Sequence, residues 1–272
     1  MIARLTTGIT AGALFLAAIF LPVPGLFVLV AGALLLVAAR EWSQLCGFGP
    51  RLQVAYVLGL ALIFIFCSRQ LDSSTAVLIP LVVLAFSLWI LAIPLLVFYR
   101  KSQAIFSNTW LVAISGAVFM LSASLGLVWL KTLPDGEWRV TLIVGLVAVA
   151  DTFAYVAGRR FGRSKLAAEI SPAKTKEGAL GGLIGNLVLA GVLVALIDFS
   201  PLSNLLIFVV ILGASLLSVV GDLTESAIKR HSGVKDSGDL LPGHGGVLDR
   251  IDGLLAATPF FVLATFLSLS LG

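Results

Sequence analysis

The pattern of hydrophobic and polar positions is dominated by long apolar runs that short polar segments separate. A helix of about 20 residues spans the roughly 30 Å hydrocarbon core of a bilayer, at 1.5 Å per residue. The pattern therefore predicts an all-α polytopic integral membrane protein with about nine transmembrane helices. The runs that predict them are residues 5–21, 23–39, 54–68, 75–98, 109–130, 140–157, 180–198, 202–220 and 254–271.

Composition supports a membrane protein independently of these runs. Hydrophobic residues make up 59% of the chain and charged residues only 12%, whereas soluble domains carry about 25% charged residues. The formal net charge is +4, but the sequence has no soluble region large enough to present a basic surface to nucleic acid. We therefore expect no nucleic-acid partner. We expect the positive charge to attract anionic lipid headgroups and phosphates.

The basic residues predict how the chain is oriented. With the N-terminus in the cytoplasm, only Arg69, Lys131 and Arg139 of the 18 lysines and arginines fall on the outer side. Cytoplasmic loops of membrane proteins are enriched in lysine and arginine, so the pattern favours this topology, with the C-terminus outside. Two polar segments, 158–180 and 221–253, then face the cytoplasm, and we expect the membrane to be a bacterial inner membrane.

The segment 221–253 is the longest polar stretch in the chain. Within it, Pro-Gly-His-Gly-Gly at 242–246 predicts a turn or loop whose glycines permit φ > 0 and close approach of the backbone to a ligand. Asp249 and Asp252 follow and share one face if the next helix has begun. If the preceding helix continues into the segment, spacings of three and four place further polar residues on one face. These are Asp222, Glu225, Ser226 and Lys229.

Carboxylates at two places, with basic residues and a glycine-rich turn between them, are typical of a site for Mg²⁺ and a polyphosphate. Mg²⁺ prefers oxygen ligands and commonly takes one or two carboxylates plus substrate phosphates. Asp222 lies at the end of one apolar run and Asp249 before the next, and the polar connection can bring them together. We therefore predict that Asp222, Asp249 and Asp252 bind the metal, with helix capping or ion pairing as the structural alternative.

A second polar block begins in the sixth apolar run. Asp151 lies among apolar neighbours, which indicates a functional acid unless it is solvated at the interface or paired with Arg159. The segment Ser-Pro-Ala-Lys-Thr-Lys-Glu-Gly at 171–178 can hold a phosphate through backbone N–H groups and its lysines. Its basic residues are also explained by the excess of positive charge in cytoplasmic loops.

The two blocks resemble the signatures of the phosphatidate cytidylyltransferase family, also called CDP-diacylglycerol synthases. The resemblance covers the C-terminal half from Asp151 onward, and Ala173 departs from it because the family often has a second lysine there. In the first block the matching residues are Asp151, Ala154, Tyr155, Gly158, Arg159, Ser171, Pro172, Lys174, Thr175, Glu177 and Gly178. In the second block they are Ser226, Lys229, Arg230, Lys235, Asp236, Pro242, His244, Gly245, Gly246, Asp249, Arg250 and Asp252.

The resemblance implies a membrane nucleotidyltransferase that makes CDP-diacylglycerol and pyrophosphate from CTP and phosphatidate, with Mg²⁺ as its cofactor. It also implies a homodimer. The candidate catalytic residues are Asp222, Asp249, Asp252, Lys229 and His244. The role of His244 stays open: it could act as a general acid, donate a hydrogen bond to a phosphate, or only form part of the turn. The candidate substrate-binding residues are Ser171, Lys174, Thr175, Glu177, Ser226, Arg230, Lys235, Asp236, Gly245, Gly246, Arg250, Asp151 and Arg159.

Two other functions are alternatives. A CTP-dependent lipid kinase, similar to polyprenol kinases, would use the same nucleotide and a membrane-bound acceptor. A polytopic transporter would also have many helices and buried acids, although it has no use for a long polar signature. In organisation, we divide the chain into an N-terminal transmembrane scaffold over 1–130 and a C-terminal catalytic region over 131–272.

Overall fold

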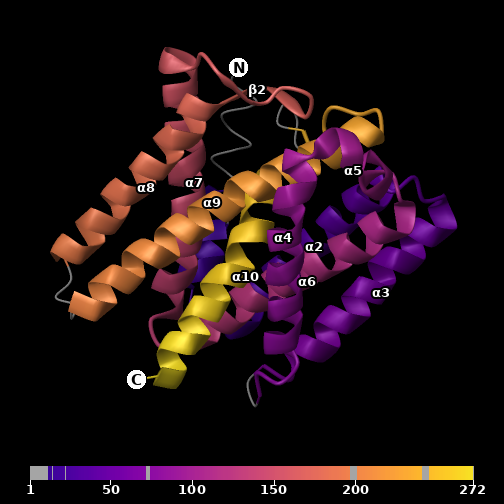
Figure 1. The fold of residues 1–272 in the computed structure, drawn as a ribbon. Coiled ribbons are helices and arrows are strands. Elements are labelled where there is room, and N and C mark those ends of the chain that lie inside the picture. Colours follow the sequence, from indigo (N-terminus) through magenta and orange to yellow (C-terminus); the bar gives the residue numbers. More distant parts are fainter. Residues whose placement is uncertain are drawn as a thin grey trace.

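The computed structural model describes residues 12–13, 15–21, 23–71, 74–196, 201–240 and 245–271. It is a bundle of long helices with a two-stranded antiparallel sheet at one end (Figure 1). In chain order the elements are α2 (Pro24–Leu45), α3 (Pro50–Ser68), α4 (Leu78–Val97), α5 (Tyr99–Phe106), α6 (Thr109–Thr132), α7 (Gly136–Phe161), β1 (Lys165–Ala167), β2 (Ser171–Thr175), α8 (Lys176–Leu196), α9 (Pro201–His231) and α10 (Leu248–Leu271).

Eight of the described helices are long and apolar enough to cross a membrane, which confirms the predicted polytopic membrane fold. They correspond to the apolar runs from 23–39 onward. The first predicted run, 5–21, lies largely outside the described residues, although residues 15–20 are helical. Helix α5 differs from the others because it has only 8 residues and follows α4 almost directly.

The segment 158–180 is more regular than the loop that the sequence predicts. Strands β1 and β2 pair with Lys165 opposite Thr175 and Ala167 opposite Ser171. Ile170, in the connection between them, is only 1% exposed and therefore anchors the hairpin to the bundle. The all-α prediction holds for the membrane bundle, and the hairpin is an addition to it.

Helix α9 is longer than its apolar run predicts. The run ends at residue 220, but the helix has 31 residues and continues to His231, a length of about 46 Å at 1.5 Å per residue. The helix is closed by Gly233, two residues after its end, which has a φ of 71°. There the Val234 N–H bonds to the Lys229 carbonyl, the bond expected where a left-handed glycine closes a helix. The polar residues 222–231 therefore lie on a helix and not in a loop.

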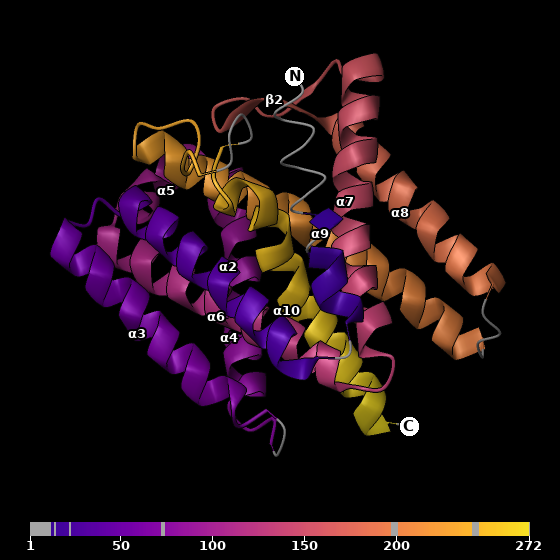
Figure 2. The ribbon, with the colours of Figure 1, turned by 180° about the vertical axis from the view of Figure 1, so that it is seen from behind.

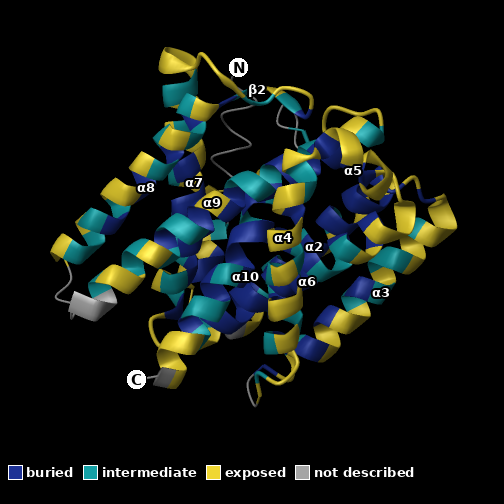
Figure 3. Ribbon diagram, viewed as in Figure 1, coloured by how far each residue is buried: buried dark blue, intermediate teal, exposed yellow. Residues whose placement is uncertain are grey.

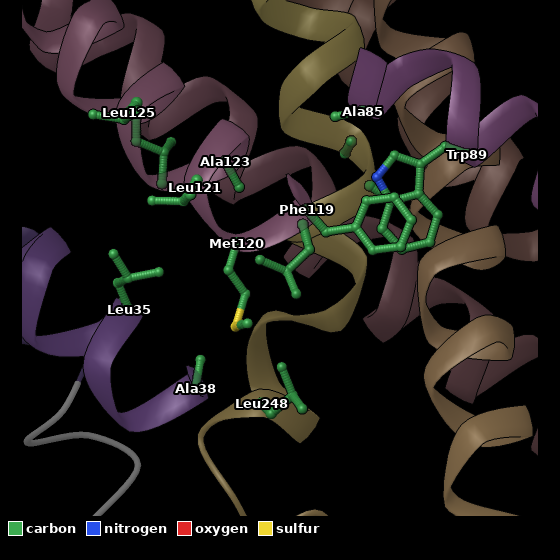
Figure 4. Close-up of a cluster of buried hydrophobic side chains, with 14 of the residues drawn as sticks. Leu35, Ala38, Ala85, Trp89, Phe119, Met120, Leu121, Ala123, Leu125 and Leu248 are labelled. Atoms are coloured by element: carbon green, nitrogen blue, oxygen red, sulfur yellow. The ribbon is translucent and has the colours of Figure 1, made fainter. Parts of the chain in front are cut away.

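Helix α6 forms the centre of the bundle and packs against α2, α4 and α10. Its Phe119 stacks on Trp89 of α4, with 3.8 Å between ring centroids (Figure 4). A Cβ at Gly116 would lie 2.1 Å from the indole of Trp42 on α2, so a glycine is needed for this contact. Buried residues are most frequent along α6 and α10 (Figure 3). Helix α10 also contacts α7 and α9 and so packs against both halves of the chain.

The polar segments meet at one end of the bundle. The β1–β2 hairpin, α5, the end of α9 and the start of α10 lie at this end, and the view from behind agrees (Figure 1 and Figure 2). The C-terminus lies at the opposite end. This arrangement follows from helices that cross the bundle in alternating directions, and it brings the two sequence blocks together.

Candidate active site

The polar face predicted for the end of α9 is present in the structure. Ser226 Oγ donates to Asp222 Oδ1 at 3.4 Å, one helical turn away. Lys229 Nζ lies 3.0 Å from Glu225 Oε1, again one turn away. Side chains at i and i+4 are neighbours on a helix, so the continuation of α9 beyond residue 220 is what assembles this face.

Asp249, in the first turn of α10, joins the face of α9 through Lys229. Lys229 Nζ donates to Asp249 Oδ1 at 2.5 Å. The same carboxylate accepts the backbone N–H of Gly246 at 2.8 Å and that of Ser237 at 3.0 Å. The Asp249 and Glu225 side chains are 9% and 2% exposed, so two buried carboxylates share one ammonium group. Such a group is stable only because the charges are paired and hydrogen-bonded.

Lys174, in β2, joins the first sequence block to the second. Its ammonium group forms an ion pair with Asp222 of α9. Burial lowers the pKa of Lys174 to about 8, while the nearby carboxylates of Asp252 and Asp151 act in the opposite direction. Aspartates of α7, α9 and α10 thus all act electrostatically on one lysine. The two sequence blocks therefore meet at Lys174 and Asp222.

The residues fit a hard metal ion by their donor chemistry. No three acidic, histidine or cysteine side chains within the described ranges lie close enough to hold a metal ion, and Lys174 and Lys229 stand between the carboxylates. Both Glu225 oxygens are buried, however: Oε1 has the Lys229 ammonium 3.0 Å away, and Oε2 has no hydrogen-bond donor among the described residues. A buried oxygen without a donor suits a cation that prefers oxygen ligands. The assignment of Asp222, Asp249 and Asp252 as ligands stays a prediction.

Two predicted substrate-binding residues hold the hairpin and the start of α8. Thr175 Oγ1 accepts the Gly178 N–H at 3.0 Å, which is the bond that an N-cap makes to the third residue of a helix. Glu177 accepts the N–H groups of Arg163 at 3.1 Å and of Ser164 at 3.2 Å. These bonds explain why the chain folds back after α7. A direct contact of either side chain with substrate stays a prediction.

The predicted arginines have different neighbours from those that the sequence suggests. Arg159 donates to the Tyr155 hydroxyl at 3.2 Å, and no ion pair between Arg159 and Asp151 is present among the described residues. Pairing with Arg159 is therefore not observed, but Asp151 is exposed, so solvation at the interface stays open as the alternative. Arg230 donates to the carbonyl of Ile170 at 3.0 Å and so braces the hairpin against α9.

The remaining predicted residues lie around the connection between α9 and α10. Lys235, Asp236 and Arg250 are exposed there, and Ser171 is half-buried in β2. Gly245 has a φ of 81°, and a Cβ on it would lie 2.7 Å from Asp249 Oδ2. Close packing against a carboxylate is thus enough to explain this glycine, and a bound phosphate is not needed to explain it. His244 lies outside the described residues.

Two acids of this site are absent from the residues selected from the sequence. Glu225 lies between Asp222 and Lys229 on the polar face of α9, so its spacing is the signal for it. Glu41 lies on α2, 4% exposed, and accepts the N–H groups of Val247 and Leu248 at the start of α10. An acid near the end of an apolar run is the only sequence signal for Glu41.

An apolar cavity of about 380 Å³ lies against the same first turns of α10. It is bounded by α2, α6 and α10, and Arg250 is part of its wall. A cavity of this size is within the range of small-molecule sites, roughly 300–1,000 Å³. Its lining includes Ala31, Leu35, Met120, Leu127, Ile251 and Leu254.

Comparison with known proteins agrees with the motifs. A family model described as the cytidylyltransferase family matches residues 2–268. The phosphatidate cytidylyltransferase of Pseudomonas aeruginosa is 39% identical over 262 residues, which are 95% of this chain and 94% of that protein. The protein of the same name from Haemophilus influenzae is 38% identical over 276 residues, with 95% and 96% covered. That of Bacillus subtilis is 48% identical over 118 residues, 43% of this chain and 44% of that protein. The chain belongs to the cytidylyltransferase family.

Proposed function

We propose that this protein makes CDP-diacylglycerol and pyrophosphate from CTP and phosphatidate in the membrane. The observation that carries the proposal is the meeting of Lys174 with Asp222, next to the Glu225–Lys229–Asp249 group, at one end of an apolar bundle. At one end of membrane-spanning helices, such a charged site would lie at the edge of the membrane, where a soluble nucleotide and a lipid could both reach it. Relatives covering 95% of the chain carry the corresponding name.

The reaction needs positioning and charge neutralisation more than acid–base chemistry. An oxygen of the phosphatidate phosphate attacks the α-phosphorus of CTP, the bond from that phosphorus to the bridging oxygen breaks, and pyrophosphate leaves. The attacking group is already an anion, so no general base is required. Lys174 and Lys229 supply fixed positive charges that can orient the phosphates and stabilise charge that develops on the leaving group.

We propose Mg²⁺ as the cofactor, with Asp222, Asp249 and Asp252 as its ligands and Glu225 as a further candidate. When bound, the ion would offset the negative charge of the triphosphate and of the departing pyrophosphate. The same polar end is proposed to face the cytoplasm of a bacterial inner membrane, because CTP is there and because the basic residues favour that side. A homodimer also stays a prediction.

The position of the radioactive label in the product tests the reaction against its nearest alternative. We expect the purified protein, given Mg²⁺ and phosphatidate, to move the label of α-³²P CTP into lipid and that of γ-³²P CTP into pyrophosphate. A CTP-dependent lipid kinase would do the reverse, with γ label in lipid and α label in CDP. Absence of Mg²⁺-dependent pyrophosphate release with both substrates present would refute the proposal.

The apolar cavity beside Arg250 supports a lipid acceptor and predicts a dependence on acyl-chain length. We propose that it receives part of an acyl chain, since its wall is apolar and lies against the helix that carries Asp249 and Asp252. Ala31→Phe should fill the cavity and raise KM for dioleoyl phosphatidate about tenfold, while KM for dihexanoyl phosphatidate and CTP changes little. Ala55→Phe, on an exposed position of α3, is the matched control. Equal effects on both lipids would contradict the assignment.

A further inference from the structure

Glu41, near the C-terminal end of α2, is a buried carboxylate that the proposed reaction does not use. Its Oε1 accepts the Val247 N–H at 3.0 Å. Its Oε2 accepts the Leu248 N–H at 2.7 Å and the Ser237 hydroxyl at 3.1 Å. Val247 and Leu248 begin α10, where N–H groups lack intrahelical partners and the helix dipole favours negative charge. A side chain of α2 therefore caps a helix that lies more than 200 positions later in the sequence.

Two glycines in the described part of the connection between α9 and α10 pack against the Glu41 carboxylate. A Cβ added to Gly238 would lie 2.6 Å from Glu41 Oε1, and one added to Gly246 would lie 2.6 Å from Oε2. Side chains cannot approach an oxygen so closely, so the backbone passes the carboxylate at positions where no side chain exists. Gly246 is part of the sequence signature, and contact with Glu41 gives it a physical reason.

The groups that Glu41 holds are continuous with those that hold Asp249. Ser237 donates its hydroxyl to Glu41 and its backbone N–H to Asp249. The Gly246 N–H donates to Asp249, and the next two N–H groups donate to Glu41. Asp249 in turn holds the Lys229 ammonium at 2.5 Å. Two buried carboxylates thus share one short stretch of backbone, and the orientation of one depends on the other.

A second bond fixes α9 to the same end of α2. Ser232 Oγ donates to the Leu45 carbonyl at 2.6 Å, directly after the helical turn that carries Lys229. The end of α2 is therefore attached both to the end of α9, which supplies Lys229, and to the start of α10, which supplies Asp249.

We propose that Glu41 is a positioning residue, which sets the Asp249 carboxylate and the Lys229 ammonium for the reaction. The inference rests on the proposed function, because it assigns Glu41 to the site of that reaction. Glu41 acts through the Ser237 and Gly246–Leu248 backbone and does not itself contact the reacting phosphates. Part of the N-terminal half then contributes to active-site geometry, in addition to supporting the bundle.

The test is to compare kcat and KM in variants that weaken this cap. Glu41→Gln keeps the size of the side chain but replaces one acceptor oxygen with an NH₂ group that faces N–H or O–H donors. We expect kcat to fall at least about tenfold. KM for CTP and phosphatidate should change less than about threefold, because the variant leaves the β1–β2 hairpin, which carries Lys174, untouched. Ser237→Ala removes one of the three bonds and should lower kcat about threefold to tenfold. Rates are measured on purified full-length protein and normalised to its monodisperse, folded fraction.

Glu137→Gln is the matched control. Glu137 pairs with Lys131 at 3.4 Å at the opposite end of the bundle, and this variant should keep wild-type kinetics. Wild-type turnover in the same assay tests the proposed function separately. A wild-type kcat for Glu41→Gln overturns the inference, and so does a loss confined to KM or to the folded fraction. If Glu41→Gln does not fold, Ser237→Ala decides: a lower kcat at unchanged KM supports the inference, and a wild-type kcat overturns it.

Discussion

Replacement of Asp249 by asparagine is expected to lower kcat by at least about 1,000-fold, which corresponds to ~4 kcal/mol of transition-state stabilisation. Asp249 holds Lys229 at 2.5 Å and accepts the N–H groups of Ser237 and Gly246. Asparagine can accept at one of these atoms only and carries no charge. Lys229 would then remain with Glu225 alone, and its ammonium would be drawn away from the position between α9 and α10. Both charge and geometry are lost at the centre of the site.

Steady-state rates and thermal unfolding in detergent check this prediction together. Complete removal of one partner from a buried ion pair costs about 3–5 kcal/mol; asparagine keeps part of the hydrogen bonding, so we expect a loss of about 1–3 kcal/mol and a folded protein. Asp239→Asn, an exposed position of the same connection, is the control and should keep wild-type rates. An Asp249→Asn protein that retained more than a tenth of wild-type kcat would contradict the role given to Asp249.

The helices were predictable because hydrophobic runs report directly which segments avoid water. The ends of the helices were not, because hydropathy does not determine where hydrogen bonding along the backbone stops. Helix α9 continues past residue 220 to His231, just before the left-handed Gly233, and its last turns are polar. The β1–β2 hairpin could not be predicted from the sequence for a related reason. Its position depends on Ile170, Arg230 and Glu177, which act through contacts with α9 and with the end of α7.

Spacing predicted which residues of the site share a helix face, but not how they pair. The positions of Asp222, Glu225 and Lys229 follow from the helical repeat. The pairing of Lys174 with Asp222 and the capping of α10 by Glu41 join segments far apart in sequence, and no local pattern contains that information. Gly245 and Gly246 illustrate the same limit. The sequence suggests that they approach a phosphate, whereas a Cβ on Gly245 would meet the Asp249 carboxylate, and one on Gly246 would meet the Ser237 hydroxyl and the Glu41 carboxylate.

Replacement of Lys174 by methionine is expected to raise KM for CTP about 100-fold, equivalent to ~2.7 kcal/mol, and to lower stability. Methionine has a similar length and no charge. Without the ammonium, Asp222 loses its ion pair, and the carboxylates of Asp151 and Asp252 lose the favourable charge of a nearby cation. Carboxylates in a common site repel one another, and a triphosphate would meet that negative charge without a lysine to offset it.

Two measurements separate loss of substrate binding from loss of structure. Lys101→Met, on an exposed position of α5, is the control and should leave KM for CTP within about twofold of wild type. Thermal unfolding of Lys174→Met should respond more strongly to added Mg²⁺ than that of wild type. A cation that binds only the folded state stabilises it by mass action. The variant has more unpaired carboxylate charge and should therefore bind Mg²⁺ more tightly. An unchanged KM for CTP would contradict the role of Lys174 in nucleotide binding. An equal Mg²⁺ response in the two proteins would contradict the view that lysine and metal compete for the same carboxylates.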